Sequence, residues 1–461
     1  MKLLPHQIIG RDYLAGRQGT TSGLFDKMGT GKTFTAQSAA LLVEEMINAV
    51  PGIIIIVPPI AMNMWVETTM NVTGFHTQLL KTGTTEINED AAVLVVSYAI
   101  AVKRVEELKA WGAHIVICDE AHALKNVTAK RTKAILGSGG LVSSVTKDDG
   151  WAWLLTGTPT TRWNDDLFPF LCHANPDGLK EKTGGLSFDK FTLRYTVTQM
   201  KRYSSYQKYA TKTVVGNLRT EELGDVVYGG DSPAAISRSL AEVWEAMPPL
   251  TQTELPIGLS MTPELKDALG ALRKIPADQI DALAKRQDPV LATIRRLIGE
   301  GKVKAFAQIV SELIEDGNGP VLIGGWHTSV LHGLKTLLPT FEILDGSTSA
   351  KKRTEIERAF NAGELDGIIG QISAMGVAIN LQQGGNRVEV IESDWSPAIM
   401  DQFYARLYRM GQERHVHINT YRHDNQIDDA LSRISATKAA EHAKLTGASD
   451  RNLDHLMETA S

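Results

Sequence analysis

A glycine-rich loop, set between a short apolar run and a helix-forming run, constrains this chain more than any other feature. Residues 23–33 read Gly-Leu-Phe-Asp-Lys-Met-Gly-Thr-Gly-Lys-Thr, and a helix is predicted over residues 34–48. Gly29 and Gly31 let successive backbone N–H groups point into one concavity, and the start of the helix adds the positive end of its dipole. This arrangement is typical of a phosphate-binding loop.

The side chains of this loop suit a nucleoside triphosphate and its Mg²⁺. Lys32 can reach the β- and γ-phosphates, and the Thr33 hydroxyl can bind Mg²⁺. Because Asp26 stands where the strict pattern has its first glycine, the loop alone leaves a chance match open. Gln7 is a candidate for reading adenine, since its amide both donates and accepts. The residues expected to bind ATP in the loop are Met28, Gly29, Thr30, Gly31, Lys32 and Thr33.

Four apolar runs follow in the first half; Pro58-Pro59 ends the first of them, and polar residues end the other three. The runs alternate with helical stretches and carry few polar residues, which predicts buried strands of a parallel sheet. Ligands of such sheets lie beyond the carboxyl ends of the strands. The predicted strands cover residues 53–57, 93–96, 114–118 and 153–155.

The third predicted strand leads directly into Asp119-Glu120-Ala121-His122. An aspartate at this position can hold Mg²⁺ together with Thr33, and the adjacent Glu120 can orient and deprotonate an attacking water. We therefore predict that Asp119 and Glu120 are catalytic, as is Lys32. Two solvated acids at a strand end are the alternative. His122 either couples this site to the threonines after the fourth strand or caps a turn.

A second α/β sheet without a phosphate loop is predicted in the second half. Its strand-like runs are at residues 321–323, 341–344, 367–369, 388–391 and 416–418. Pro248, Pro249 and Pro256 predict a linker between the halves. We therefore expect one lobe over 1–250, with a protrusion near 190–250, and another over 251–461. Helical stretches are predicted over 236–246 and, as an insertion in the second lobe, over 263–316.

Two arginines in the second half have a spacing that suits a helix. Arg406 follows Gln402 by four residues, on one face of a helix, and Arg409 lies three residues further on. Two arginines that converge on a γ-phosphate would act as arginine fingers, with Gln402 beside the nucleotide. An arginine-rich solvated helix face is the alternative.

A basic, tyrosine-rich stretch lies near the middle of the chain. Residues 194–219 hold six Lys or Arg residues, four Tyr and no acid, within a chain of net charge −5. An acidic protein needs such a local field to attract a polyanion, and basic groups with stacking rings suit a nucleic-acid backbone. We predict phosphate contacts from Lys201, Arg202 and Lys208; a solvated basic face is the alternative.

The compartment is predicted from cysteines and hydropathy. Cys118 and Cys172 are the only cysteines, so no disulfide framework is available. No apolar run is long enough to span a bilayer, and Pro5-His6-Gln7 comes too early for the apolar region of a signal peptide. We expect a soluble intracellular protein, for example in the cytoplasm of a bacterial or phage-infected cell.

Taken together and in order, these motifs resemble the core of a superfamily-two helicase, and specifically a Swi/Snf-type double-stranded-DNA translocase. Residues 402–412, which end in Arg-Met-Gly-Gln, are the most family-specific match. One departure is in residues 374–381, Ala-Met-Gly-Val-Ala-Ile-Asn-Leu, where two glycines of the family pattern are replaced. The resemblance implies DNA contacts from Ser97, Ser347 and Asn380.

The resemblance implies two RecA-like lobes that use ATP and Mg²⁺ to move along duplex or branched DNA as a monomeric core. Unwinding, annealing or branch migration would follow, in DNA repair, recombination or replication. Two rivals stay open: an RNA helicase of the DEAH type, which shares Asp119-Glu120-Ala121-His122, and a nucleotide-gated DNA clamp with little hydrolysis. The Arg-x-Gly-Gln ending disfavours the first, and intact Glu120, Arg406 and Arg409 disfavour the second.

Overall fold

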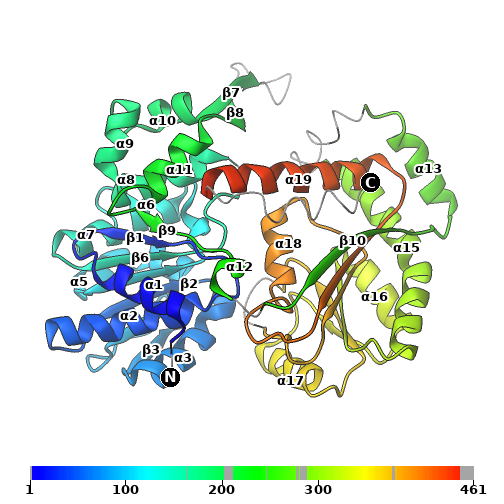
Figure 1. Ribbon diagram of the computed structural model, residues 1–461, viewed down its shortest axis with the longest axis horizontal. Helices are drawn as coiled ribbons and strands as arrows, with labels where there is room; N and C mark the ends of the chain where they lie inside the picture. Colours follow the sequence, from blue (N-terminus) through cyan, green and yellow to red (C-terminus); the bar gives the residue numbers. More distant parts are fainter. Residues whose placement is uncertain are drawn as a thin grey trace. The chain divides into compact units, whose positions relative to one another are not determined.

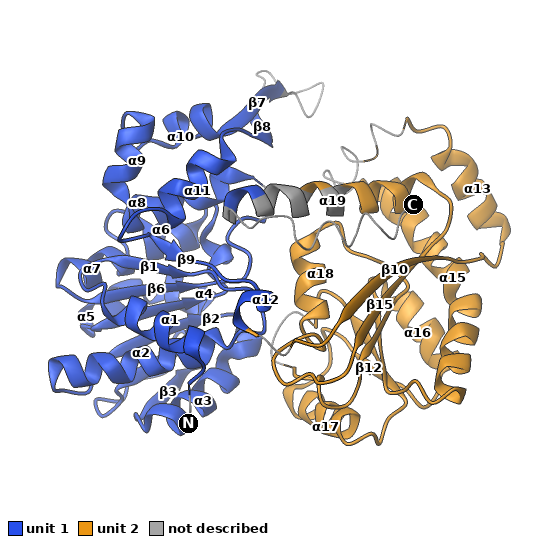
Figure 2. Cartoon of the chain, in the orientation of Figure 1, with its two compact units in different colours: residues 1–243, 441–450 blue, residues 244–440, 451–461 orange. Residues whose placement is uncertain are grey.

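The computed structural model separates into two compact units, each built on its own sheet (Figures 1 and 2). Unit 1 comprises residues 1–243 and 441–450, and unit 2 comprises residues 244–440 and 451–461. The structure describes residues 3–161, 163–201, 211–244, 247–276, 280, 288–375 and 379–446. Both sheets are parallel with helices around them, which confirms the predicted α/β class.

Unit 1 has a seven-stranded parallel sheet of order β3-β4-β2-β5-β6-β1-β9. All four predicted strands are confirmed, and every residue of β2 and β6 is buried, as expected for the middle of a parallel sheet. The strands are β1 Thr21–Leu24, β2 Ile53–Val57, β3 Thr77–Leu80, β4 Val93–Ser97, β5 Ile115–Asp119, β6 Trp151–Leu155 and β9 Ala235–Ile236.

The first helix is fixed to this sheet by two buried tryptophans of β6. The indole N–H of Trp151 donates to Ala15 O at 2.8 Å, and that of Trp153 donates to Leu14 O at 3.1 Å. The α-helices of the unit are α1 Pro5–Ala15, α2 Lys32–Ile47, α3 Met62–Thr73, α4 Tyr98–Lys103, α5 Val105–Ala110, α6 Lys130–Leu136, α7 Leu141–Lys147, α8 Phe168–Ala174, α9 Pro176–Thr183, α10 Phe188–Tyr195, α11 Thr220–Tyr228 and α12 Leu240–Val243. Short 3-10 helices are η1 Pro59–Ala61, η2 Ala121–Leu124 and η3 Asn164–Leu167.

The basic stretch contains an antiparallel hairpin, β7 Thr196–Lys201 with β8 Thr211–Asn217. Arg202 and Lys208 lie outside the described residues, and Lys201 is the last residue of β7. Although the stretch has no acid of its own, acids from neighbouring helices reach it. The Arg194 guanidinium donates to both carboxylate oxygens of Glu222, at 2.6 and 2.8 Å, and Lys212 Nζ lies 3.8 Å from Asp189 Oδ1.

Unit 2 has a six-stranded parallel sheet of order β10-β15-β14-β11-β13-β12. The five predicted strands are confirmed. The predicted linker is wrong over residues 250–256, which form β10, whereas Pro248 and Pro249 lie between the unit boundary at residues 243–244 and this strand. β10 is an edge strand, where the closing Pro256 removes no ladder hydrogen bond. The strands are β10 Leu250–Pro256, β11 Val321–Gly325, β12 Glu342–Leu344, β13 Gly367–Gln371, β14 Arg387–Val390 and β15 Val416–Arg422.

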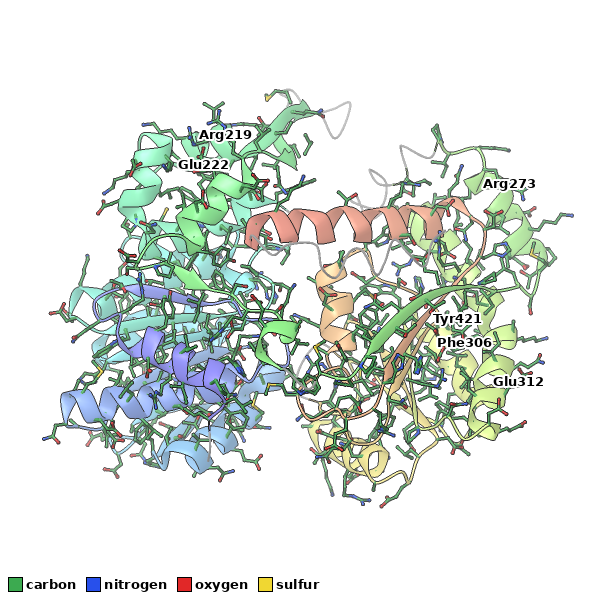
Figure 3. The ribbon with its side chains drawn as sticks, in the orientation of Figure 1. Arg219, Glu222, Arg273, Phe306, Glu312 and Tyr421 are labelled. Atoms are coloured by element: carbon green, nitrogen blue, oxygen red, sulfur yellow. The ribbon has the colours of Figure 1, made fainter. Side chains whose placement is uncertain are left out.

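A long helix covers part of this second sheet. Phe306 of α15 packs edge-on against Tyr421 of β15, with ring centroids 5.0 Å apart (Figure 3). The helices are α13 Pro263–Leu272, α15 Pro289–Glu315, α16 Thr328–Leu337, α17 Ala350–Asn361, α18 Pro397–Tyr404 and α19 Gln426–Thr446. Of the helix predicted over residues 236–246, only the four-residue α12 is helical in the described residues: residue 236 belongs to β9, and residues 237–239 and 244 are not helical. Residues 245–246 lie outside the described residues. Within the described part of the chain, no helix combines the length and hydropathy needed to cross a membrane.

Candidate nucleotide site

The glycine-rich loop joins β1 to α2 at the carboxyl edge of the first sheet. Gly29 and Gly31 have φ values of 82° and 84°, in the left-handed region that glycine adopts without strain. Lys32 Nζ donates to Asp26 O at 2.7 Å and to Lys27 O at 3.1 Å, so the ammonium lies over the loop. Burial lowers the pKa of Lys32, whereas nearby carboxylates, Glu120 foremost, raise it. The Lys32 ammonium therefore lies near Asp26, which follows β1, and near Asp119 and Glu120 at the end of β5.

The start of α1 lies against the tip of the loop. His6 Nε2 is 2.9 Å from Thr30 O, and Gln7 Nε2 donates to the same oxygen at 3.4 Å. A Cβ atom at Gly31 would clash with Gln7 Nε2, so a larger residue here would push the Gln7 amide away from the loop. The structure thus brings Gln7 to the loop, while its Oε1 accepts from Leu4 N at 3.0 Å.

Asp119 ends β5 and is held on three sides. Trp65 of α3 is fully buried, and its Nε1 donates to Asp119 Oδ2 at 2.8 Å. Glu120 N donates to Asp119 Oδ1 at 3.0 Å, and Tyr98 Oη donates to Asp119 O at 2.7 Å. Burial raises the pKa of Asp119 to about 6, with Glu120 adding to the rise and the Trp65 N–H opposing it. The sequence did not predict this role for Trp65. Its position in the helix that follows Pro58-Pro59 was the feature that could have drawn attention to it.

Glu120 has a strained backbone, and its side chain is linked through His122 to Thr156, which follows β6. Its φ and ψ are both 49°, a left-handed conformation that is uncommon for a residue with a side chain and that concentrates at functional sites. Glu120 Oε2 lies 3.2 Å from His122 Nδ1, which is 3.4 Å from Thr156 Oγ1. Thr158 N donates to that same hydroxyl at 3.1 Å. This geometry favours the coupling role for His122 over turn capping.

The loop after β6 also packs on the phosphate loop. A Cβ atom at Gly157 would lie 3.1 Å from Met28 N and 2.8 Å from Met28 Cγ, so glycine is needed for this approach. The ends of β1, β5 and β6, neighbours in the sheet, therefore meet around one site.

The residues at this site fit a nucleotide with its Mg²⁺. Among the residues that the structure describes, no group of three or more His, Cys, Asp or Glu could hold a metal ion. A nucleotide-borne Mg²⁺ needs only one or two protein oxygens, because phosphates and waters fill the remaining positions. Thr33, in the first turn of α2, and Asp119 would supply those oxygens.

In unit 2 the structure corrects the helical spacing of the arginines. Helix α18 ends at Tyr404, so Gln402 is helical, whereas Arg406 and Arg409 lie in the turns that follow. Arg406 is 9% exposed, and its guanidinium donates to Gln402 O at 2.9 Å and to Ile379 O at 3.4 Å. Arg409 is less buried and donates to the side chain of Asn380. The two arginines therefore have different surroundings.

Other parts of the same motif organise the backbone. Glu357 accepts from Asn380 N at 3.0 Å; burial raises the pKa of Glu357, and Arg409 is among the groups that oppose the rise. Gln412 is 1% exposed and donates to Gly385 O at 2.9 Å, while its Oε1 accepts from Glu413 N at 3.1 Å. Gln412 also donates from Nε2 to Leu407 O at 3.3 Å and from its backbone N–H to Arg409 O at 3.0 Å, so it fixes the turn that carries Arg409.

The residues predicted to contact DNA differ in exposure. Ser97 is 4% exposed and caps α4, where its hydroxyl accepts from Ile100 N at 3.4 Å. Ser347 is exposed and donates to Asp345 Oδ1 at 2.7 Å. Asn380 is exposed and held by Arg409. Residues 376–378, within the altered glycine pattern, lie outside the described residues.

Fold and site define a two-unit α/β protein with a glycine-rich loop between β1 and α2 of its first unit. Residues 6–221 match the family model of the SNF2-related domain, and residues 301–411 match that of the helicase conserved C-terminal domain. The chain belongs to the Swi/Snf-type group of superfamily-two helicases.

Individual proteins resemble the chain at low identity. It is 23% identical to SWI/SNF-related matrix-associated actin-dependent regulator of chromatin subfamily A-like protein 1 of Xenopus laevis, over 93% of this chain and 42% of that relative. It is 21% identical to DNA repair and recombination protein RDH54 of Saccharomyces cerevisiae, over 78% of this chain and 40% of the relative. The chain spans less than half the length of these relatives. Among solved structures, the SWI2/SNF2 ATPase core of Sulfolobus solfataricus in complex with dsDNA has 20% identity and a TM-score of 0.43, with 99% of this chain and 97% of that chain covered.

Proposed function

We propose that the protein is an ATP-dependent DNA translocase that couples hydrolysis at the unit 1 site to movement along duplex or branched DNA. The observation that carries the proposal is the meeting of Lys32, Asp119 and Glu120 at one sheet edge, in a chain that has both helicase-type domains. The name of one relative, a DNA repair and recombination protein, adds support for DNA as the partner. Repair, recombination or replication would be its setting, and the core would act as a monomer.

In this proposal each residue at the edge has one task. The N–H groups of residues 28–33 bind the phosphates, and Lys32 neutralises their charge. Thr33 and Asp119 would hold the Mg²⁺ of the nucleotide, which would supply positive charge to the phosphates when bound. Glu120 orients the attacking water and accepts its proton, while His122 holds the Glu120 carboxylate toward Thr156. Gln7 reads the adenine.

Unit 2 would complete catalysis through its arginines. Arg409 is the better candidate for a finger, because it is less buried and its hydrogen bond within the described residues goes to the exposed amide of Asn380, whereas Arg406 is buried against backbone carbonyls. A finger typically contributes about 10³- to 10⁵-fold in rate. Gln402 would contact the nucleotide. Ser347 and Asn380 in unit 2 and Ser97 in unit 1 would contact DNA.

The test is ATPase activity with duplex DNA, single-stranded DNA, RNA or no nucleic acid, followed by displacement of a third strand from duplex DNA. The proposal expects stimulation by duplex DNA, ATP-dependent displacement, and loss of both in Lys32→Ala. Stimulation by RNA alone would identify an RNA helicase. ATP-dependent DNA binding without turnover would identify a nucleotide-gated clamp. Forks and four-way junctions, compared with plain duplex, would then define the preferred DNA structure.

A further inference from the structure

An arginine far along the chain holds the first residue of the phosphate loop. Arg238 follows β9, 212 residues after Asp26, and lies beyond the part of the chain that matches the SNF2-related domain. Its Nε donates to Asp26 Oδ1 at 2.9 Å and its Nη2 to Asp26 Oδ2 at 2.6 Å. The Asp26 side chain is 2% exposed and that of Arg238 16% exposed. This two-pronged geometry is the strongest form of an arginine–carboxylate pair.

The same guanidinium also binds the start of α1. Arg238 Nη1 donates to His6 O at 2.6 Å. His6 and Gln7 in turn contact Thr30 O at the loop tip. The Arg238 side chain therefore holds the phosphate loop at two points. It binds Asp26 at the start of the loop directly, and it supports Thr30 at the tip through the start of α1.

The backbone around Arg238 is attached to the loop as well. Phe25 N donates to Ile236 O at 2.8 Å, and Lys27 N donates to Arg238 O at 2.9 Å. The Ser237 hydroxyl donates to Phe25 O at 3.1 Å. The pairing that begins in β9 thus continues past the strand to residue 238. Only α12 then separates this attachment from residue 244, where unit 2 begins.

We propose that Arg238 is a positioning residue for nucleotide binding, and that through it the phosphate loop fixes the chain segment that leads into unit 2. This inference rests on the proposed function only in requiring that the loop binds ATP. If ATP binding orders the loop, it must also order the segment attached to it, and loss of the attachment must weaken ATP binding in return. Asp26, which departs from the strict phosphate-loop pattern, is then the anchor of this attachment.

The main test variant removes both charges at once. Removing Arg238 alone would leave a buried, uncompensated carboxylate and unfold the unit, whereas Asp26→Asn with Arg238→Gln leaves two neutral polar side chains and avoids that penalty. ATP affinity is measured by titration calorimetry, and amide hydrogen exchange is measured on peptides covering residues 237–244 with and without a non-hydrolysable ATP analogue. Arg104→Gln is the control, since this mostly buried arginine pairs with Glu107 at the start of α5.

The proposal expects ATP to slow exchange over residues 237–244 in the wild-type protein and in Arg104→Gln. In the double variant that protection disappears and ATP binds about tenfold more weakly, a loss comparable to the lower end of that seen when the supporting partner of a metal ligand is removed. The single change Arg238→Lys keeps the positive charge but cannot make two parallel hydrogen bonds to Asp26, so this variant should also bind ATP more weakly than the wild-type protein. A folded double variant with wild-type affinity and protection would overturn the proposal and leave the pair as a stability element. No ATP binding by the wild-type protein would overturn the proposed function itself, and this inference with it.

Discussion

Trp65 Nε1 donates to Asp119 Oδ2 at 2.8 Å, so a buried indole fixes one oxygen of the carboxylate proposed to bind Mg²⁺. The other oxygen accepts from Glu120 N at 3.0 Å. Asp119 is therefore set in one orientation by two donors from different elements. A rigidly held ligand needs no reorganisation when the metal binds, which ties α3 to the chemistry at the end of β5.

Trp65→Phe keeps an aromatic ring in the core but removes the N–H donor. We expect the Mg²⁺ concentration for half-maximal ATPase activity to rise about tenfold or more, as is typical when a metal ligand loses its supporting partner. Steady-state ATPase assays over a Mg²⁺ series measure this. Trp153→Phe is the control, because its indole donates to Leu14 O and its loss should change stability alone. An unchanged Mg²⁺ requirement in Trp65→Phe would show that this bond serves only packing.

Glu120→Gln should separate ATP binding from hydrolysis. The amide keeps the size of the side chain but cannot accept the proton of the attacking water, so turnover should fall by about 10²- to 10⁴-fold while ATP binding is retained. Single-turnover ATPase assays and equilibrium binding measure the two steps. Lys32→Ala should instead abolish hydrolysis because it removes a principal cation that contacts the phosphates. Normal turnover by Glu120→Gln would remove this residue from the catalytic role.

Arg409→Ala and Arg406→Ala should fail in different ways. Arg409→Ala should lower kcat far more than ATP affinity, as loss of a transition-state contact does. Arg406→Ala removes a buried guanidinium from Gln402 O and Ile379 O, so we expect reduced stability as well as reduced kcat. Thermal unfolding and DNA-stimulated ATPase kinetics distinguish them. If Arg409→Ala weakens ATP binding alone, Arg409 is a binding group and not a finger.

Changing Lys201, Arg202 and Lys208 together to Ala should weaken DNA binding on every sequence. Each lost phosphate contact should reduce the salt slope by about 0.7 to 0.9, while ATPase activity without DNA stays intact. Binding is measured at several salt concentrations. Changing Lys180, Lys182 and Lys190 to Ala removes the same charge elsewhere in unit 1 and should alter the slope much less. Equal slopes for the two triple variants would place the DNA path elsewhere.

Glu389 should make unit 2 less stable as pH rises. Burial raises the pKa of Glu389 from 4.5 to about 7, although Tyr421 and Asn419 donate to its carboxylate. Because the folded pKa exceeds the unfolded one, stability is greatest below about pH 4.5 and falls until about pH 7, by about 3 kcal/mol. Glu389→Gln should abolish this fall, as measured by amide exchange of β14 and β15 in urea at pH 5 and 8. The exposed-residue control, Glu264→Gln, should keep it; an identical pH profile for Glu389→Gln would assign the fall to other groups.

The sequence by itself determined the sheets and the chemistry at their edges. Runs such as residues 53–57 are apolar throughout, and only the middle of a parallel sheet buries both faces of a strand, so these strands were predictable. The roles of Lys32, Asp119 and Glu120 were predictable for a related reason. Lys32 directly follows the glycine turn, and Asp119 and Glu120 directly follow the apolar run of residues 114–118. Their chemistry depends on local spacing, which a sequence displays.

Tertiary structure decided what depends on partners far along the chain. Residues 235–236 and 250–256 are strands only because each adds to the edge of an existing sheet, and neither a two-residue run nor a largely polar run carries such a signal alone. Arg406 and Arg409 left the predicted helix because it ends at Tyr404. Trp65 and Arg238 reach their carboxylates across 54 and 212 residues. A hydrogen bond is directional and acts over about 3 Å, so only the folded backbone fixes which donor meets which acceptor.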